Sequence, residues 1–251
     1  MMRNLQEMMQ IIQKEYGQPV DIEFTLNLSE NREYMINLLQ CRPLQAFEDT
    51  GDVQVPEEIP EENLLLYSEG ASMGLSRAVP LDFIVYVDPI SYYELPYAQK
   101  DSVAKTIGKI NWKYRNAGKH MMLIVPGRIG TTSPELGVPT TFADISEFDV
   151  ICELSVSGVG YNPELSYGSH IFQDLVEAGI LYTAVFEDEH TKAYHPEKLL
   201  KIPNLLTEML PDAGGLESVV RICDVSRMDC RLYNDLRNEQ LYVIMGRDEM
   251  A

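Results

Sequence analysis

The chain has 251 residues, of which 45% are hydrophobic and 24% charged, and its formal net charge is -19. This composition indicates a folded protein with room for one large domain, or for one domain and a smaller piece. The negative charge would repel a nucleic-acid backbone or an anionic membrane surface, so we expect neither as the main partner. No apolar run approaches the ~20 residues of a membrane span. The N-terminus also lacks a basic-then-apolar signal, so we expect a cytoplasmic protein. The four cysteines lack the short paired spacing of zinc or redox sites, so we expect reduced thiols.

An amphipathic helix is predicted over residues 1–16, because apolar side chains recur there at helical spacing. Polar and apolar residues then alternate over residues 20–25, which predicts a strand with one packed face. The polar stretch over residues 28–34 is typical of a hairpin loop, and residues 38–43 form the second predicted strand. A helix and two strands bury too little apolar surface to be stable alone, so we expect them to dock on further protein.

The polar face of this predicted hairpin carries a carboxylate, an amide and a guanidinium. Asp21 and Glu23 share one face of the first strand, and antiparallel pairing would bring Gln40 and Arg42 beside Glu23. A carboxylate suits a hard cation such as Mg2+, and the planar arginine fork suits phosphate oxygens. One interpretation is therefore the surround of a magnesium-bound polyphosphate. The alternative is an ordinary solvated strand face.

Residues 17–44, GQPVDIEFTLNLSENREYMINLLQCRPL, resemble the closing hairpin of the ATP-grasp nucleotide-binding domain in phosphoenolpyruvate synthase and pyruvate phosphate dikinase. In that family an Asp-Ile-Glu-Phe/Trp strand is followed by a Leu-Gln-x-Arg-Pro strand, and both patterns stand here in that order. The resemblance implies that Glu23 is a ligand of the metal-bound ATP. It also implies that Gln40 and Arg42 contact the nucleotide phosphates, with Arg42 in the catalytic role. The implied cofactors are Mg2+ and ATP.

Other parts of the family pattern have no counterpart in the sequence. We find no glycine-rich lid of the ATP site, no phosphohistidine signature and no catalytic barrel. We therefore expect that the nucleotide site is completed by an ATP-grasp region preceding Met1, and that the isolated chain is inactive. The resemblance then implies the C-terminal part of a phosphoenolpyruvate synthase-like, ATP-dependent phosphotransferase, that is, a kinase.

Acidic residues and prolines gather in residues 47–63, which is typical of a linker. We expect residues 1–46 to be the C-terminal piece of an ATP-grasp domain, residues 47–63 an acidic linker, and residues 64–251 an α/β domain.

Apolar runs and helical patterns alternate beyond this linker. Nearly continuous apolar runs predict buried strands at residues 81–87, 121–125, 150–154 and 180–186. Helices are predicted at residues 98–116, 169–178 and 197–210, and late strands at residues 219–223 and 241–245. The expected fold class is α/β, with an open, mainly parallel sheet covered on both faces.

The loop at residues 126–133 follows a buried strand, at the edge where open α/β sheets bind ligands. Glycines permit close approach of backbone amides, hydroxyl groups can donate, and an arginine supplies positive charge. These residues are Gly127, Arg128, Gly130, Thr131, Thr132 and Ser133. A small anion would suit this loop. The Gly-Lys-Ser/Thr end of a phosphate-binding Walker loop is absent, and an ordinary turn is the alternative.

His170 begins the predicted helix that Ser169 can cap, and a helix N-terminus is well placed to meet an anion. The alternative is a histidine held in packing or bonded to a neighbouring loop. Residues 123–175 are similar to a region that follows the ATP-grasp part in some bacterial phosphoenolpyruvate synthase-like proteins. Those proteins read Gly-Pro-Gly-Arg-Trp-Gly-Ser and Gly-Thr-His-Phe-Phe-Gln at the matching places. The similarity implies Arg128 and His170 as site residues without naming their ligand.

Two functions therefore compete. One is a phosphotransferase fragment that supplies part of a Mg-ATP site, and the other is a non-catalytic regulatory module that binds a small anionic metabolite. Lys105, Lys109 and Lys113 form a basic stripe at four-residue spacing, which we expect to face solvent. The acceptor substrate, the strand order and assembly into a homo-oligomer stay open.

Overall fold

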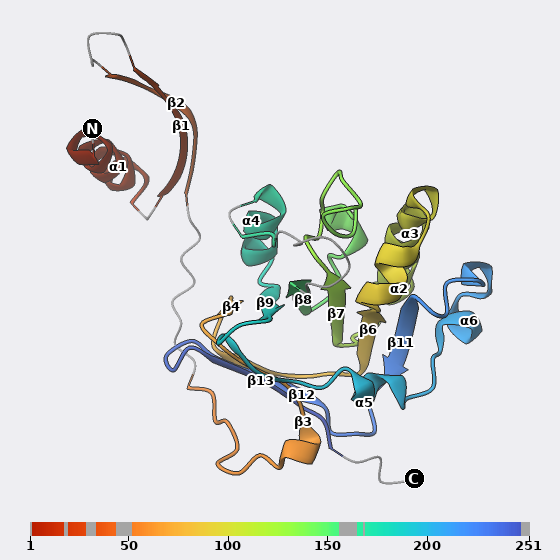
Figure 1. Ribbon diagram of the computed structural model, residues 1–251. Coiled ribbons are helices and arrows are strands. Elements are labelled where there is room, and N and C mark those ends of the chain that lie inside the picture. The colour runs from red at the N-terminus through yellow and green to blue at the C-terminus, as the bar shows by residue number, and fades with distance from the viewer. Residues whose placement is uncertain are drawn as a thin grey trace. The chain divides into compact units, whose positions relative to one another are not determined.

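The computed structural model describes residues 2–17, 20–28, 34–43, 52–155, 165–167 and 169–246. Contacts divide the chain into two compact units, residues 1–49 and 50–251, whose elements are shown in Figure 1. The expected domain boundaries at residues 46 and 63 stay a prediction. None of the described helices combines the length and apolar character needed to cross a bilayer. The expected cytoplasmic location stays a prediction.

The smaller unit consists of a helix and a two-stranded antiparallel sheet, which confirms the predicted helix and hairpin. The elements are α1 (Met2–Tyr16), β1 (Val20–Leu28) and β2 (Tyr34–Pro43). Most of the predicted hairpin loop, residues 29–33, lies outside the described residues. Among the described side chains of these elements, only Val20 is buried. The unit therefore has almost no core of its own.

A six-stranded sheet forms the centre of the larger unit, in the order β11-β6-β7-β8-β9-β4. Neighbours from β6 to β9 pair in parallel, while β11 and β4 pair antiparallel at the two edges. The strands are β4 (Ser72–Met73), β6 (Phe83–Val87), β7 (Met121–Pro126), β8 (Val150–Ser155), β9 (Leu181–Phe186) and β11 (Val220–Asp224). The chain is thus mixed α/β, as expected.

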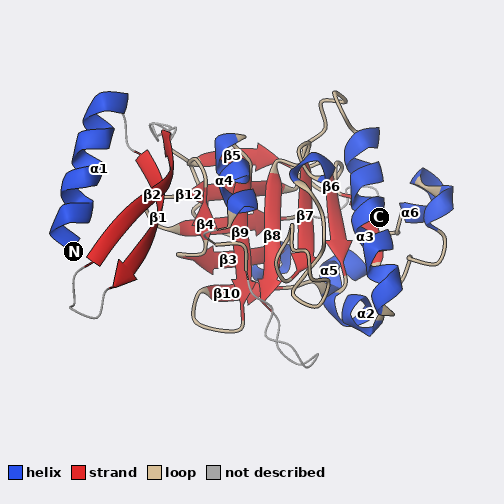
Figure 2. Ribbon diagram, turned by 90° about the horizontal axis from the view of Figure 1, so that it is seen from above, coloured by secondary structure: helices blue, strands red, loops and turns tan. Residues whose placement is uncertain are grey.

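A second, wholly antiparallel sheet was not predicted, although the strand expected at residues 241–245 is one of its members. Its order is β10-β3-β13-β12-β5. The strands are β3 (Leu64–Glu69), β5 (Arg77–Pro80), β10 (Thr191–Tyr194), β12 (Arg231–Asp235) and β13 (Gln240–Ile244). Seen from above, its strands cross those of the six-stranded sheet at a steep angle (Figure 2). The expectation of one open, mainly parallel sheet therefore describes only the central layer.

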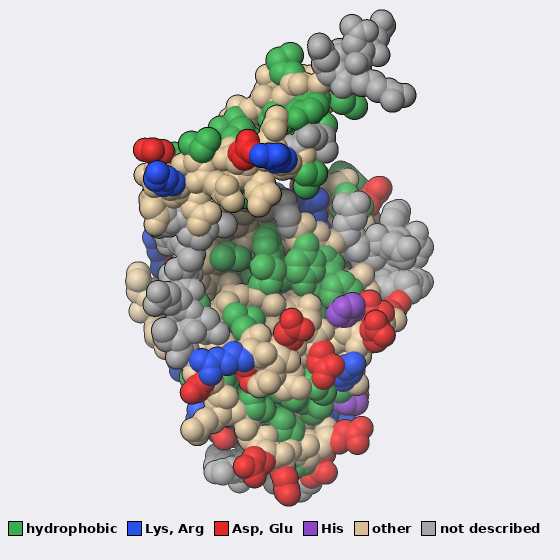
Figure 3. Space-filling model, turned by 90° about the vertical axis from the view of Figure 1, so that its left-hand side faces the viewer, with side chains coloured by type: hydrophobic (Ala, Val, Ile, Leu, Met, Phe, Trp, Pro, Cys, Tyr) green, Lys and Arg blue, Asp and Glu red, His purple; other side chains and the backbone are tan. Residues whose placement is uncertain are grey.

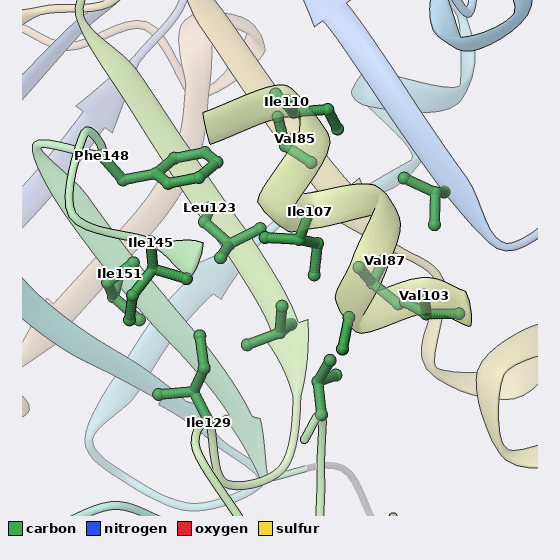
Figure 4. Packing of buried hydrophobic residues seen from close by; sticks show 14 of the residues in the cluster. Val85, Val87, Val103, Ile107, Ile110, Leu123, Ile129, Ile145, Phe148 and Ile151 are labelled. Carbon is green, nitrogen blue, oxygen red and sulfur yellow. The ribbon is translucent and has the colours of Figure 1, made fainter. Parts of the chain in front are cut away.

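The central sheet is covered on both faces, by helices on one and by the antiparallel sheet on the other (Figure 1). The helices are α2 (Pro89–Glu94), α3 (Tyr97–Lys113) and α4 (His170–Glu177). Val103, Ile107 and Ile110 of α3 turn toward Leu123 and Ile151 of the sheet (Figure 4). A second apolar cluster fills the space between the two sheets. Burial on both faces explains why the central strands are continuously apolar.

The helix predicted over residues 197–210 is wrong. The structure has two short helices instead, α5 (Glu197–Leu200) and α6 (Leu206–Met209). Pro203 stands between them, and a proline has no backbone N–H and disfavours a helical residue before it. Asn204 then accepts hydrogen bonds at its Oδ1 from the amides of Leu206 and Ile222, each at 3.0 Å. The described residues of this unit also include short 3-10 turns at Glu61–Asn63, Phe142–Asp144 and Pro211–Ala213.

Candidate functional site

The register of the hairpin places the predicted site residues together. Glu23 is paired with Gln40, and Asp21 is paired with Arg42. Because side chains alternate along a strand, these four residues share one face of the sheet. When the Gln40 amide is turned so that its oxygen faces Arg42, it accepts hydrogen bonds from the guanidinium at Nε and Nη2. The amide and the guanidinium therefore touch.

A β-bulge follows directly after the Glu23–Gln40 pair. Phe24 pairs with Leu38, so Leu39 is left as the extra residue on β2. Bulges bend and twist a strand locally and often re-aim side chains beside functional sites. The bulge therefore lies between the strand ends that carry Glu23 and Arg42 and the strand pairs that lead to the hairpin loop.

Large apolar side chains are exposed across the smaller unit. They are Met2, Met9, Ile11, Tyr16, Phe24, Leu28, Tyr34, Met35, Leu38 and Leu39. Such a density of exposed apolar groups is typical of a surface that another protein segment covers. The polar face with Glu23 and Arg42 therefore belongs to a unit with many exposed apolar side chains.

In the larger unit, several backbone amides of the predicted anion loop already donate hydrogen bonds to carbonyl groups of the protein. The Gly127 amide donates to the Leu154 carbonyl at 2.9 Å. The Arg128 amide donates to the Leu136 carbonyl at 2.9 Å, and the Gly130 amide donates to the Val138 carbonyl at 3.1 Å. The Thr131 hydroxyl accepts the Ser133 amide at 3.0 Å. An anion at this loop would therefore meet side chains, such as those of Arg128 and the exposed Thr132, rather than these amides.

Glycine is required here because two parts of the loop approach each other closely. Gly137 has a φ of +156°, and a Cβ atom on it would lie 2.1 Å from the Arg128 carbonyl oxygen. Gly127 has a φ of +63°, and its Cβ atom would lie 2.3 Å from the Leu136 carbonyl oxygen. The close approach is thus between segments of one loop.

Glu153, which the sequence did not indicate as a site residue, is hydrogen-bonded to this loop through the Ile129 amide. It lies near the end of β8 and is fully buried. Its carboxylate accepts hydrogen bonds from the amides of Ile129 (2.8 Å) and Ser166 (2.7 Å), from the Ser166 hydroxyl, and from Tyr182 Oη (2.6 Å). Burial raises the pKa of Glu153, and these donors oppose the shift. The lone acidic residue in the apolar run VICELS was the available signal.

Two tyrosines of α2 and a buried lysine support the loop from the side. Tyr92 Oη donates to the Gly137 carbonyl at 2.7 Å. The Lys100 ammonium lies 4.7 Å from the centre of the Tyr92 ring and 4.9 Å from that of Tyr93. Burial lowers the pKa of Lys100, while the rings stabilise its charge. The loop that carries Arg128 is therefore firmly positioned.

His170 is the first residue of α4, and its side chain is exposed. Ser169 occupies the cap position, but its hydroxyl donates to the Ser166 carbonyl at 2.6 Å and makes no side-chain cap bond. The expected capping role of Ser169 is therefore wrong. A Cβ atom on Gly130 would lie 2.4 Å from Ile171 Cδ1, so the loop packs against the first turn of α4. The two predicted anion elements are neighbours.

One comparison with known proteins relates to the first of these sites. The family model of the pyruvate phosphate dikinase AMP/ATP-binding domain matches residues 1–63, and this segment contains the whole described hairpin. No curated protein and no solved structure matches the chain. The similarity of residues 123–175 to a phosphoenolpyruvate synthase-like region stays a prediction. For the N-terminal segment, the match supports a relationship to pyruvate phosphate dikinase and to ATP-binding, kinase-like proteins.

Proposed function

We propose that the helix and hairpin at residues 2–43 form part of the Mg-ATP site of an ATP-dependent phosphotransferase related to pyruvate phosphate dikinase and phosphoenolpyruvate synthase. The observation that carries the proposal is the family match over residues 1–63, within which Glu23, Gln40 and Arg42 share one sheet face. Glu23 is the metal ligand, and Gln40 and Arg42 contact phosphate oxygens.

The chemistry of these side chains fits a metal-bound polyphosphate. Magnesium prefers oxygen ligands, often one or two carboxylates together with substrate phosphates. Arginine presents a planar fork that matches phosphate oxygens. Phosphoryl transfer depends mainly on positioning and charge neutralisation, and Arg42 would stabilise the charge of the transferring group.

The remaining wall of the site is supplied, in this proposal, by a further ATP-grasp region of the same protein. The exposed apolar side chains of the smaller unit support this, because α1 alone exposes Met2, Ile11 and Tyr16 by more than half of their surface. A two-stranded sheet with one helix needs such a partner to be stable. The isolated chain then binds nucleotide weakly and is inactive.

A regulatory, anion-binding role of the larger unit is the second candidate. The packing of the Arg128 loop against the first turn of α4 favours it, since open α/β sheets bind ligands at the ends of their parallel strands. In this candidate Arg128, Thr132 and His170 hold a small anionic metabolite, and the hairpin is an attachment.

Calorimetric titration of the intact protein with Mg-ATP separates the two candidates. Arg42→Ala should weaken binding by about 10- to 100-fold, the value of a charge-assisted hydrogen bond. Arg3→Ala is the matched control, because Arg3 is an exposed arginine of α1 that pairs with Glu7. Unchanged Mg-ATP affinity in Arg42→Ala would contradict the phosphotransferase proposal and favour the regulatory one.

A further inference from the structure

Two adjoining grooves lie along α3 in the larger unit, and their linings contain no residue of the sites described above. The first has a volume of about 430 Å³ and lies between α3 and the turn that contains Gly215. The second has a volume of about 620 Å³ and is lined by Trp112 and Lys113. Lys105 and Lys109 line both grooves, so the two form one continuous surface.

The lysines of this surface are exposed and stand on the side of α3 opposite its core residues. Val103, Ile107 and Ile110 are buried, whereas Lys105 and Lys109 are exposed. Like charges four residues apart on a helix repel each other. In the part of the chain that the structure describes, neither ammonium forms an ion pair.

Acidic residues outnumber basic ones in this chain, 39 to 20. The net charge is -19, and acidic side chains gather in the lower part of the face in Figure 3. Two carboxylates lie near the lysines. Asp144 accepts hydrogen bonds from the Thr141 amide (2.8 Å) and hydroxyl (2.7 Å), and Asp212 lines the first groove. Lys113 also lines the second groove, so the surface carries three ammonium groups against the carboxylates of Asp144 and Asp212.

The second groove adds an apolar wall. Trp112 is 70% exposed, and Leu210 lies with it in the lining. Arg115 stacks on the Trp112 ring at 5.2 Å. An exposed aromatic ring beside two ammonium groups combines an apolar contact with a charge contact, which is the arrangement of small-molecule sites.

We propose that these grooves bind a small phosphorylated molecule, with its phosphate at Lys105 and Lys109 and its apolar part against Trp112. Both volumes fall within the range of about 300–1,000 Å³ for small-molecule sites. The net charge argues against a nucleic acid or an anionic membrane as the occupant. The site is independent of the hairpin, so the proposed ATP site can fail while this one holds.

Fluorescence tests the proposal directly, because Trp112 is the only tryptophan of the chain. Phenyl phosphate is the probe. Inorganic phosphate and phenol, which each represent one half of the probe, are titrated for comparison. We expect a saturable fluorescence change with phenyl phosphate, at least about tenfold weaker binding of either half, and weaker binding at high salt.

Variants locate the binding. Lys105→Gln and Lys109→Gln should each weaken phenyl phosphate binding by about tenfold or more. Lys201→Gln removes the same charge from a lysine that lines neither groove and should leave binding unchanged. Circular dichroism checks that each variant is folded. A non-saturable change, retained affinity in the Lys105→Gln/Lys109→Gln double variant, or an equal loss in Lys201→Gln would overturn the proposal.

Discussion

Replacing Glu153 by alanine should strongly destabilise the larger unit. The substitution removes the acceptor of the amides of Ile129 and Ser166 and of the Tyr182 hydroxyl, all of which are buried. The Ser166 hydroxyl keeps a second acceptor, because it also donates to the Ile129 carbonyl at 3.2 Å. Each buried donor without an acceptor costs about 1–3 kcal/mol, so the loss from these three donors should be roughly 3–9 kcal/mol.

Glu153→Gln should cost less, about 1–3 kcal/mol, because the amide keeps one acceptor oxygen but turns its NH2 group toward a donor. The pH dependence of this cost has a definite sign. Burial raises the pKa of Glu153 in the folded state above the usual value of 4.5. The stability of the wild type relative to Glu153→Gln is therefore greatest below pH 4.5, and it falls as the pH rises through the folded-state pKa.

Urea unfolding, followed by Trp112 fluorescence and circular dichroism between pH 4 and 7, measures both effects. Glu177→Gln is the control, since Glu177 is an exposed glutamate at the end of α4. A loss below about 1 kcal/mol in Glu153→Ala would show that the four hydrogen bonds do not hold the loop. If the stability advantage of the wild type over Glu153→Gln grew with rising pH, the assigned direction of the pKa shift would be refuted.

Three further outcomes are expected. Gly137→Ala should lower the free energy of unfolding by about 2–4 kcal/mol because its Cβ atom meets the Arg128 backbone, whereas Gly118→Ala, in open space at a φ of +63°, should cost about 1–2 kcal/mol in the same urea assay. Burial alone would raise the pKa of Asp82, but the interactions of its carboxylate, chiefly that with Lys119, outweigh burial and lower the pKa. Asp82→Asn should therefore reduce the free energy of unfolding by under about 1 kcal/mol at pH 7, and by nothing once the pH is well below 3.8. Ser169→Ala should leave helix content by circular dichroism unchanged, because Ser169 does not cap α4.

Equal destabilisation by both alanine substitutions would mean that the Gly137 contact relaxes without cost. A cost of Asp82→Asn that persists at low pH would show that the carboxylate charge is not its source. A clear loss of helix in Ser169→Ala would restore the capping role.

The central layer of the fold could be predicted because its strands are buried on both faces. The run at β7, Met121–Pro126, is buried throughout, and such a run is recognisable from the sequence. In the antiparallel sheet only β13 was predicted, as the late strand at residues 241–245, because the other strands are short and carry buried polar residues. β12 buries Asn234 and Asp235, whose side chains bond to the Leu75 carbonyl and to the turn after the strand. Composition alone cannot distinguish such a strand from a loop.

Alternation and strand order predicted two antiparallel strands with Gln40 and Arg42 beside Glu23, but not the exact register, in which Arg42 pairs with Asp21 and a bulge follows Glu23. The hydrogen bonds of Glu153 could not be predicted, because their donors include residues far away in the sequence, such as Tyr182. The hydrogen bonds of the loop amides could not be predicted either. A glycine allows close approach of a ligand and of a second backbone segment equally well. The ligands assigned to both sites stay predictions.

The Mg2+ dependence of ATP binding to the intact protein tests the central claim most directly. If Glu23 holds the metal and Arg42 the phosphates, ATP should bind the wild type more tightly as Mg2+ is raised. Glu23→Gln should lose this dependence while keeping its metal-free affinity, and Arg42→Ala should be weaker at every Mg2+ concentration. Glu7→Gln, an exposed glutamate of the same unit, is the matched control. An unchanged Mg2+ dependence in Glu23→Gln would contradict the account.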